Sequence, residues 1–421
     1  MSVSFLSLPE LRRTPPEIDG HLHPRFEPVA AALRRQLRAY PGGAAVCVYH
    51  RGECVVDLWG GSADDAGTPW LRDTMAPSFS TSKGVAATTL HVMADRGLLD
   101  YDDRVADHWP EFAQAGKQAI TVRHVLSHQS GLYHIRQMID HARRMLDWDY
   151  MIHAIERAEP LHPPGERTGY HGLTFGFLVG ELVQRVGGRP FSEMVQEAVS
   201  DRLGLDGLYI GAPPHVLHRA AELIWRRPRL QPPRMFFGPT VEPLGDLVAS
   251  AARGYEQLWR MAGVELDLTS LLDALAPRGI NSLDFSANET LSVAIPAANG
   301  LFTARSLALM YAALAGGGEI GGVRLLSSET LARATERQRR TSSLRVIPFD
   351  MRWRLGYHGV ATTRGVPEHA FGHFGFGGSG GWADPSRNLA VALIVNSGMG
   401  TPFGDFRIAR IGGAVLDSLR D

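Results

Sequence analysis

The stretch Ser80-Thr81-Ser82-Lys83 stands at the entrance of residues 82–96, whose apolar spacing predicts a helix. Residues three positions apart share one face of a helix, so the Ser80 hydroxyl and the Lys83 amine can touch. A serine hydroxyl is a poor nucleophile until a base takes its proton, and a lysine does this only when burial or positive surroundings lower its pKa. The alternative is that Ser80 caps the helix and that Lys83 is solvated.

The rarity of lysine favours the chemical interpretation of this motif. Lys83 and Lys117 are the two lysines among 43 basic residues, so arginine is the ordinary surface cation of this chain. A lysine at a motif position is therefore less easily explained as one more solvated charge.

A tyrosine provides a possible partner for the serine and the lysine. Residues 165–172, GERTGYHG, place Tyr170 in a glycine-flanked turn immediately before a predicted helix over residues 175–186. A phenol near an ammonium group has a lowered pKa, so Lys83 and Tyr170 could share the proton transfers that a histidine performs elsewhere. The alternative is a buried tyrosine with one satisfied hydroxyl.

The third candidate region is close to the carboxyl end. Residues 373–376, HFGF, predict a strand, and residues 377–382, GGSGGW, follow it. An edge strand with small residues beside it lets a substrate carbonyl approach backbone N–H groups, as an oxyanion hole requires, and the N–H groups of Phe376 and Ser80 would serve. The alternative is a glycine-rich turn between two core strands.

At these three places together the chain resembles the superfamily of serine β-lactamases and penicillin-binding proteins, in particular its esterase branch, the family VIII carboxylesterases. The resemblance extends from about Gly43 to Asn396. Three connecting phrases also look like those of the family: GLLD at 97–100 with Asp102 and Asp103, TVRHVLSHQSGL at 121–132, and NGLF at 299–302.

The resemblance implies a role for each motif. Ser80 would be the acylated nucleophile, Lys83 and Tyr170 the proton-transfer pair, and His373 and Gly375 would lie beside the substrate. His373 would occupy the position where many β-lactamases have the lysine of K-T-G.

Two departures from the β-lactamase pattern concern the substrate. His373 replaces a cation, and Tyr170-His171-Gly172 stands where Tyr-x-Asn is usual, so an amide is missing as well. The missing cation would suit the carboxylate of a β-lactam, and the missing amide would suit its side-chain amide. Ester hydrolysis is therefore favoured over antibiotic hydrolysis.

A rival nucleophile must be weighed, because residues 377–381 also satisfy G-x-S-x-G, the nucleophile elbow of α/β-hydrolases. An elbow needs a strand, the serine and then a helix. Residues 382–385, WADP, instead predict a turn into a strand over residues 389–395. Ser379 is therefore interpreted as a chance match in a glycine-rich segment.

The sequence predicts neither a metal nor a cofactor. His124 and His128 are four residues apart in a helical segment, but no glutamate follows His124 as H-E-x-x-H would need. His21 and His23 have no third ligand nearby.

Composition limits the remaining classes of function. The 421 residues are 44% hydrophobic and 21% charged, which predicts a globular protein with a large core. A net charge of -1 supplies no basic field for nucleic acid. The sequence shows neither an export signal nor a stretch of about 18 apolar residues, so we expect no membrane span and a cytoplasmic location. No feature specifies an oligomeric state.

The order of predicted elements agrees with the fold that the resemblance implies. That fold is the β-lactamase-like α/β (α+β) sandwich, an antiparallel sheet flanked by helices with an inserted, mainly helical subdomain as the opposite wall of the cleft. We expect one catalytic unit over residues 1–421, with an α/β subdomain at 20–115 and 290–421 and a helical and lid subdomain at 116–289. The predicted helices and strands that support this division are at 27–40, 304–315 and from 408 onward for helices, and at 44–49, 53–58, 370–376 and 389–396 for strands.

An aromatic, proline-rich stretch from Trp225 to Pro243 predicts a loop or lid. Its side chains Trp225, Met235, Phe236 and Phe237 would suit a short or medium acyl chain or an aryl ester.

The two cysteines flank a predicted hairpin turn. If this turn centres on Arg51-Gly52, Cys47 faces Val56 and Cys54 faces Tyr49, so the thiols are not directly opposed. Buried free thiols are expected.

The sequence therefore predicts a serine hydrolase that cleaves small-molecule carboxylic esters. The alternatives on the same fold are a β-lactamase, a D-amino-acid peptidase and an acyltransferase. A catalytically silent binding protein is the non-enzyme alternative, and the intact set of Ser80, Lys83 and Tyr170 argues against it.

Overall fold

The computed structural model describes residues 17–224, 267–339, 341, 343–398 and 406–420. Its centre is an antiparallel sheet of seven strands in the order β1-β3-β2-β14-β13-β12-β11. The strands are β1 Ile18–Leu22, β2 Gly43–His50, β3 Glu53–Gly61, β11 His358–Gly359, β12 Phe371–Phe374, β13 Gly380–Asp384 and β14 Leu389–Val395.

The two ends of the chain meet in the middle of this sheet. All seven residues of β14 are buried, and the strand pairs with β2 from Leu389 opposite His50 to Val395 opposite Ala44. An apolar run of this kind is typical of a strand that is covered on both faces. Residues more than three hundred positions apart are therefore held in one register.

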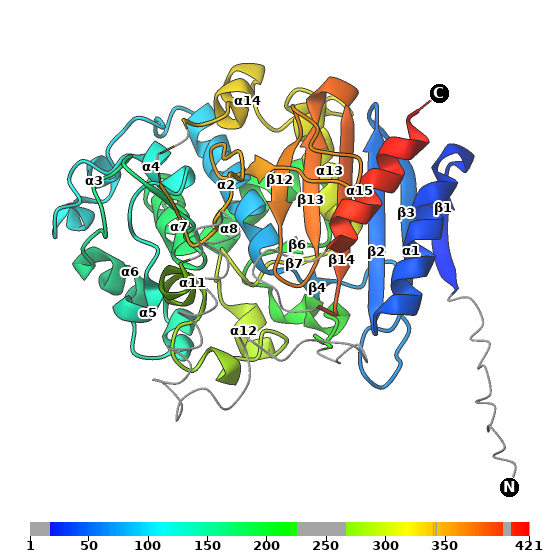
Figure 1. Cartoon of the computed structure of the whole chain (residues 1–421), viewed down its shortest axis with the longest axis horizontal. Coiled ribbons are helices and arrows are strands. Elements are labelled where there is room, and N and C mark those ends of the chain that lie inside the picture. Colours follow the sequence, from blue (N-terminus) through cyan, green and yellow to red (C-terminus); the bar gives the residue numbers. More distant parts are fainter. Residues whose placement is uncertain (1–16, 225–266, 340, 342, 399–405, 421) are drawn as a thin grey trace, which may run out of the picture.

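Helices cover both faces of the sheet (Figure 1). On one face, α1 Glu27–Ala39 and α15 Phe406–Ser418 form an apolar cluster with alternate residues of β2 and β14, such as Val46 and Val391. The opposite residues of the same strands, such as Ala45 and Ala392, join the cluster that contains α13 Ala304–Ala315 and α2 Ser82–Asp95. This alternation follows from the two-residue period of a strand.

A mainly helical part lies beyond α2, to the left in Figure 1. Its helix α7, Thr174–Gly187, packs on α2, so α2 lies between this part and the sheet. The remaining helices are α3 Val105–His108, α4 Val122–Leu126, α5 Ile135–Met138, α6 Trp148–Arg157, α7 Thr174–Gly187, α8 Phe191–Val195, α9 Asp201–Leu203, α11 Leu268–Leu275, α12 Asn288–Ser292 and α14 Ser328–Thr335. Short strands are β4 Ala76–Pro77, β5 Thr168–Gly169, β6 Leu208–Tyr209, β7 Leu301–Phe302, β8 Glu319–Ile320, β9 Val323–Arg324 and β10 Leu344–Arg345.

The predicted α/β fold is confirmed, and so are the long helices and the β2, β3, β12 and β14 strands, although β12 ends at Phe374. The turn predicted after Ser379 is wrong, because residues 380–384 form β13. Residue 381 of this strand is a glycine because α13 leaves no room for a side chain. A Cβ there would lie 2.5 Å from the Tyr311 ring. The glycine-rich turn considered for residues 377–381 is present before β13, where the Gly378 N–H donates to the Gly375 carbonyl at 3.1 Å. Within β13, Gly381 allows a helix to approach the sheet closely.

The prediction for the cysteines is also wrong in part. A register shift in the β2–β3 hairpin places Cys47 opposite Asp57 rather than Val56, although Cys54 does face Tyr49. The two sulfur atoms lie 3.8 Å apart. Both thiols are free, but Cys54 is only partly buried.

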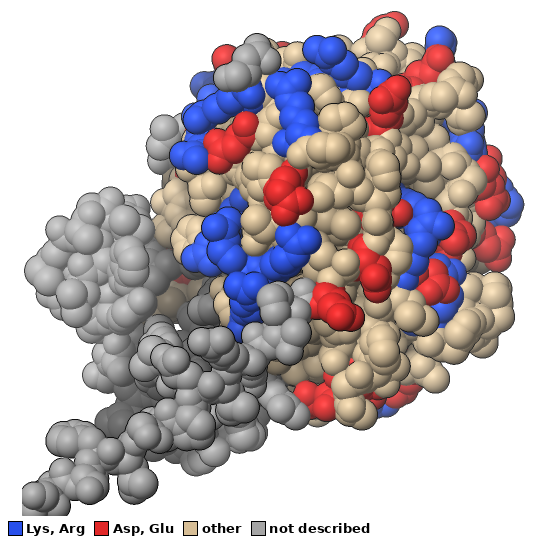
Figure 2. Space-filling view, turned by 90° about the vertical axis from the view of Figure 1, so that its right-hand side faces the viewer, with Lys and Arg blue, Asp and Glu red and all other residues tan. Residues whose placement is uncertain are grey.

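No helix in the described ranges is both long and apolar enough to cross a bilayer. Figure 2 shows one face of the molecule, on which Lys and Arg side chains are interspersed with Asp and Glu.

Candidate active site

Ser80 lies in a single helical turn, Phe79–Thr81, that leads into α2. The residue before it, Phe79, has a φ of +45°, a left-handed conformation that is costly for a large side chain. The turn is held by Ser82, whose hydroxyl donates to the Phe79 carbonyl at 2.5 Å and accepts from the Gly300 N–H at 2.8 Å. The Asn299-Gly300 phrase therefore supports the backbone of the serine.

Three predicted residues come together at the Ser80 hydroxyl. Lys83 Nζ lies 2.9 Å from Ser80 Oγ, and the Tyr170 hydroxyl donates to the same oxygen at 2.9 Å. Lys83 Nζ also donates to the backbone carbonyls of Gly172, at 2.6 Å, and Ala297, at 3.1 Å. Sequence reasoning missed these two carbonyls, because a backbone acceptor has no side-chain signal.

Burial determines the charge of the lysine. Lys83 is fully buried, and this desolvation lowers its pKa well below the usual range, as expected. A neutral amine has two N–H donors and one lone pair. In this neutral form, donation to the carbonyls of Gly172 and Ala297 uses both N–H groups and leaves the lone pair for the Ser80 proton, whereas the ammonium form donates to Ser80 Oγ as well.

The expected lowering of the Tyr170 pKa is wrong. Its pKa is raised rather than lowered, because burial disfavours the phenolate. The predicted lowering required a charged ammonium beside the phenol, whereas Lys83 is itself driven towards the neutral form. Tyr170 is therefore a phenol that donates its proton to Ser80 Oγ.

The Tyr170 ring is fixed by aromatic neighbours that sequence reasoning did not select for this purpose. The Trp353 ring is stacked on it at 5.7 Å between centroids, and the His128 ring meets it edge-on at 5.0 Å. Gly169 must be glycine, because a Cβ would lie 2.1 Å from the Tyr133 ring. This packing explains the Thr-Gly-Tyr order and leaves the hydroxyl directed at Ser80.

Hydrogen-bond directions define the state of His373 on β12. Its Nδ1 lies 3.1 Å from the Phe374 carbonyl, which requires a proton on Nδ1. Nε2 then has a lone pair, and it has no hydrogen-bond partner within the described part of the chain. Burial, with nearby His358 and Lys83, lowers the pKa of His373 well below its usual range. Burial therefore favours the neutral imidazole at this position.

His358 supports this edge of the sheet. Its Nε2 accepts from the Phe374 N–H at 3.0 Å and its Nδ1 donates to the Gly359 carbonyl at 2.8 Å. Burial lowers the pKa of His358 to about 4. Its ring meets the His373 ring edge-on at 4.8 Å. His358 therefore contacts both the end of β12 and the side chain of His373.

The glycine-rich segment after β12 turns back against the nucleophile. The Gly375 N–H donates to the Ser379 carbonyl at 2.8 Å, and a Cβ at Gly375 would lie 2.3 Å from the Ser78 carbonyl oxygen. The Phe376 and Phe79 rings are 5.7 Å apart. Residue 376, a predicted oxyanion-hole donor, therefore lies next to the segment that carries Ser80.

The structure argues against Ser379 as the nucleophile. Ser379 is buried beside β13, its hydroxyl accepts from the Val395 N–H at 3.1 Å, and a strand rather than a helix follows it. A nucleophile elbow requires an exposed serine at the start of a helix.

His124 and His128, which were considered as zinc ligands, form hydrogen bonds with different segments. His124 Nδ1 accepts from the Thr121 N–H at 3.2 Å, whereas His128 Nδ1 accepts from the His171 N–H at 3.2 Å. Within the described ranges, no three His, Cys, Asp or Glu side chains form a group that could hold a metal ion.

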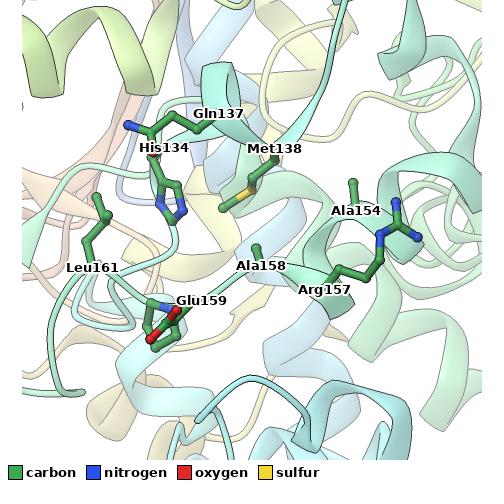
Figure 3. A pocket seen from close by; sticks show the side chains of 9 residues that line it. His134, Gln137, Met138, Ala154, Arg157, Ala158, Glu159 and Leu161 are labelled. Carbon is green, nitrogen blue, oxygen red and sulfur yellow. The ribbon is translucent and has the colours of Figure 1, made fainter.

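The predicted lid residues Trp225, Met235, Phe236 and Phe237 are outside the described residues. A surface hollow of about 400 Å³ is shown in Figure 3. Its lining contains none of the three residues at the Ser80 hydroxyl and is made by His134, Gln137, Met138, Ala154, Arg157, Ala158, Glu159, Pro160 and Leu161.

Comparison with known proteins identifies the family. The family model described as Beta-lactamase matches residues 32–415. The chain is 36% identical over 394 residues to "Esterase/beta-lactamase LipL" of Mycobacterium tuberculosis, an alignment that covers 90% of this chain and 82% of that protein.

Two solved structures are similar over nearly the whole chain. A penicillin-binding protein homologue from Caulobacter crescentus has a TM-score of 0.80 and 35% identity, covering 96% of this chain and 100% of that one. A structure described as a family VIII carboxylesterase has a TM-score of 0.79 and 33% identity with the same coverage. The chain therefore belongs to the superfamily of beta-lactamases and penicillin-binding proteins, as an esterase/beta-lactamase-family hydrolase with family VIII carboxylesterases among its relatives.

Proposed function

We propose that the chain hydrolyses small-molecule carboxylic esters through a covalent acyl-enzyme on Ser80. The observation that carries this proposal is the directed chain of hydrogen bonds at the serine. Tyr170 donates to Ser80 Oγ, and Lys83 Nζ is 2.9 Å from the same oxygen, where the neutral amine can present its lone pair to the serine proton. Lys83 is then the base that takes the Ser80 proton, and Tyr170 is a proton donor.

Acylation follows from these positions. Ser80 Oγ attacks the ester carbonyl carbon while its proton passes to Lys83 Nζ. The carbonyl oxygen becomes an oxyanion, which the N–H groups of Ser80 and Phe376 would stabilise. When the carbon–oxygen bond to the alcohol breaks, the Tyr170 hydroxyl protonates the leaving oxygen, and the Lys83 ammonium returns a proton to Tyr170.

Deacylation uses the same groups. A water molecule attacks the acyl carbon and gives up its proton to neutral Lys83. The second oxyanion collapses, the bond from carbon to Ser80 Oγ breaks, and Lys83 returns the proton to the serine. The carboxylic acid leaves, and no cofactor takes part in this scheme.

The neutral His373 supports an ester rather than a β-lactam as the substrate. Its Nε2 offers a lone pair and no positive charge, so it cannot pair with the carboxylate that β-lactams carry. The description of one relative as a family VIII carboxylesterase agrees with this choice, and the name of another, an esterase/beta-lactamase, includes ester hydrolysis.

A substrate panel tests the proposal. We expect kcat/KM for p-nitrophenyl butyrate to exceed that for nitrocefin by orders of magnitude, and D-alanyl peptides to be poor substrates. Comparable values for the ester and nitrocefin would favour a β-lactamase. Transfer of the acyl group to an added alcohol in preference to water would favour an acyltransferase.

Covalent labelling tests the nucleophile. A fluorophosphonate should attach to Ser80, as mapped by peptide mass spectrometry, and Ser80→Ala should lose both the label and ester turnover. An adduct on any other residue, or no adduct with any serine-directed reagent, would reject the proposal.

A further inference from the structure

A buried arginine lies on the far side of the glycine-rich turn from Ser80. Arg407 is the second residue of α15 and is only 2% exposed. Its Nη2 donates to the carbonyls of Gly377 and Ser397, and its Nη1 donates to the Ser397 hydroxyl at 3.3 Å. The guanidinium also stacks on the Tyr40 ring at 4.6 Å. Arg407 thus connects α15, the end of β14 and the turn.

The turn that Arg407 contacts is packed on both sides. A Cβ at Gly375 would lie 2.3 Å from the Ser78 carbonyl oxygen, so the turn touches the segment that carries Ser80. On the other side, a Cβ at Gly398 would lie 3.0 Å from Gly377 Cα. A displacement at Gly377 would therefore move its neighbour Phe376 relative to Ser80.

Helix stability does not explain an arginine at this position. A cation in the first turn of a helix opposes the helix dipole, and burying a guanidinium costs free energy unless its donors are satisfied. Here Nη2 bridges two carbonyls on different segments while Nη1 donates to the Ser397 hydroxyl, and a lysine, which has a single nitrogen, cannot occupy both positions.

We propose that Arg407 is a positioning residue that fixes the Phe376 N–H at the oxyanion hole by holding the Gly377 and Ser397 carbonyls together. The inference rests on the proposed function, because it assigns Arg407 a task in the oxyanion hole of that reaction. Arg407 itself touches no reacting atom.

The test compares Arg407→Lys and Arg407→Met with Arg410→Met, which changes an exposed arginine of the same helix. For p-nitrophenyl butyrate we expect both Arg407 variants to lose kcat by about 10- to 100-fold with KM nearly unchanged, since misplacing an oxyanion donor affects the transition state. A boronic acid, which forms a tetrahedral adduct, should bind more weakly by a similar factor. Arg410→Met should behave like the unmodified protein.

Active-site titration keeps the test valid if a variant folds poorly. Rates are calculated per molecule that the fluorophosphonate labels at Ser80 after exhaustive reaction, so loss of folded protein does not imitate loss of kcat. Unchanged kcat and boronate affinity per labelled molecule would overturn the Arg407 inference alone. Failure of the unmodified protein to be labelled or to hydrolyse esters would instead overturn the proposed function.

A second observation, independent of the first, concerns the two thiols. The bulged register of the β2–β3 hairpin brings Cys47 Sγ within 3.8 Å of Cys54 Sγ, and Cys54 is partly exposed. We infer that this pair is a modification site that hydrogen peroxide converts into a disulfide. The Cys54 thiolate would attack the peroxide and break its O–O bond, which gives a sulfenic acid and water. Cys47 would then displace a second water as the S–S bond forms.

Mass spectrometry under denaturing conditions tests the thiol pair. Peroxide-treated protein should be lighter by two hydrogen atoms, contain a cross-linked pair of peptides and recover both thiols with dithiothreitol. Cys47→Ala should leave a Cys54 sulfenic acid that dimedone traps, and Cys54→Ala should leave Cys47 unreacted because it is fully buried. An unchanged mass, a disulfide between two chains, or equal reactivity of the two single variants would overturn this inference.

Discussion

At the scale of single residues, burial shifts the pKa values of Lys83 and Tyr170 in opposite directions. Desolvation disfavours the charged form of each group, so it lowers the pKa of the lysine and raises that of the tyrosine. The result is a neutral amine that can accept a proton and a neutral phenol that can donate one. Ser80 Oγ is 2.9 Å from both.

The first prediction follows for Lys83. Lys83→Arg keeps a cation but cannot give up its proton, so kcat should fall by about 10²- to 10⁴-fold. In the unmodified protein, kcat/KM should rise with pH as Lys83 deprotonates, with a midpoint well below the usual lysine range. That rise should be absent in the variant.

Lys117 offers a matched control, because it is also buried and its Nζ donates to the carbonyls of Glu156 and Ala158. Lys117→Arg should lower stability without a comparable loss of kcat. If Lys83→Arg kept more than a tenth of kcat, a loss below about 1.4 kcal/mol, proton removal by Lys83 would be dispensable.

The second prediction concerns the Tyr170 hydroxyl. Tyr170→Phe keeps the ring that stacks on Trp353 but removes the donor to Ser80, so kcat should fall by about 10²-fold while KM changes little. Tyr133→Phe, which changes the tyrosine whose ring packs on Gly169, is the matched control and should retain turnover. Steady-state kinetics with one ester measure both, and a Tyr170→Phe kcat within a factor of about three of the unmodified protein, under 1 kcal/mol, would remove the phenol from the mechanism.

The spacing of the motif predicts the contact between Ser80 and Lys83 but not the charge on the lysine. That charge depends on burial and on the carbonyls of Gly172 and Ala297, which come from distant segments. The direction of the Tyr170 pKa shift was predicted wrongly for the same reason. Local sequence shows which groups can meet, whereas their protonation depends on the tertiary environment.

At the scale of elements, the third prediction concerns Ser379 and the β13–β14 pair. Ser379→Ala removes a hydroxyl that accepts from the Val395 N–H at 3.1 Å, so the free energy of unfolding should fall by about 1 kcal/mol. The fluorophosphonate label should remain on Ser80, and ester turnover should persist. Urea unfolding and peptide mapping measure these outcomes, and loss of the label in a folded variant would restore Ser379 as a candidate nucleophile.

Elements with a strong apolar period were predicted well. Seven consecutive apolar residues predict β14 as a buried strand, and the alanine-rich sequence of α13 predicts a helix. β13 was missed because Gly380 and Gly381 carry no side chain to show a period, and their reason for being glycine is the Tyr311 ring on another element. β1 was missed because its middle residues are exposed.

At the scale of the whole molecule, the sheet joins the two ends of the chain and so fixes the site. The Ser80 segment leads into α2, which lies between the sheet and the helical part. The glycine-rich turn connects β12 and β13, which are close to the other end of the sequence. Tyr170 comes from the helical part. The site therefore requires the complete fold, and no single segment contains it.

Acid should destabilise this fold at pH values where most carboxylates are still ionised. Burial lowers the pKa of His91, His134 and His358 to about 4 and that of His171 to about 3. In the unfolded chain a histidine titrates near 6.5, so between about pH 4 and 6.5 the unfolded state binds more protons than the folded state. The stability that these groups contribute is fully present above about pH 6.5 and is lost as the pH falls.

The fourth prediction is the resulting slope. Each buried neutral histidine should reduce the free energy of unfolding by up to about 1.4 kcal/mol per pH unit between pH 6 and 5. His91 accepts from the Tyr101 hydroxyl and its Nε2 is 3.0 Å from the Leu355 carbonyl, so His91→Gln can keep polar contacts without a titrating ring. That variant should show a slope smaller by about one proton. Urea unfolding at pH 7, 6 and 5 measures both proteins. A stability that is flat over this range would show that burial does not lower the pKa values of these histidines, and a His91→Gln slope equal to that of the unmodified protein would show the same for His91.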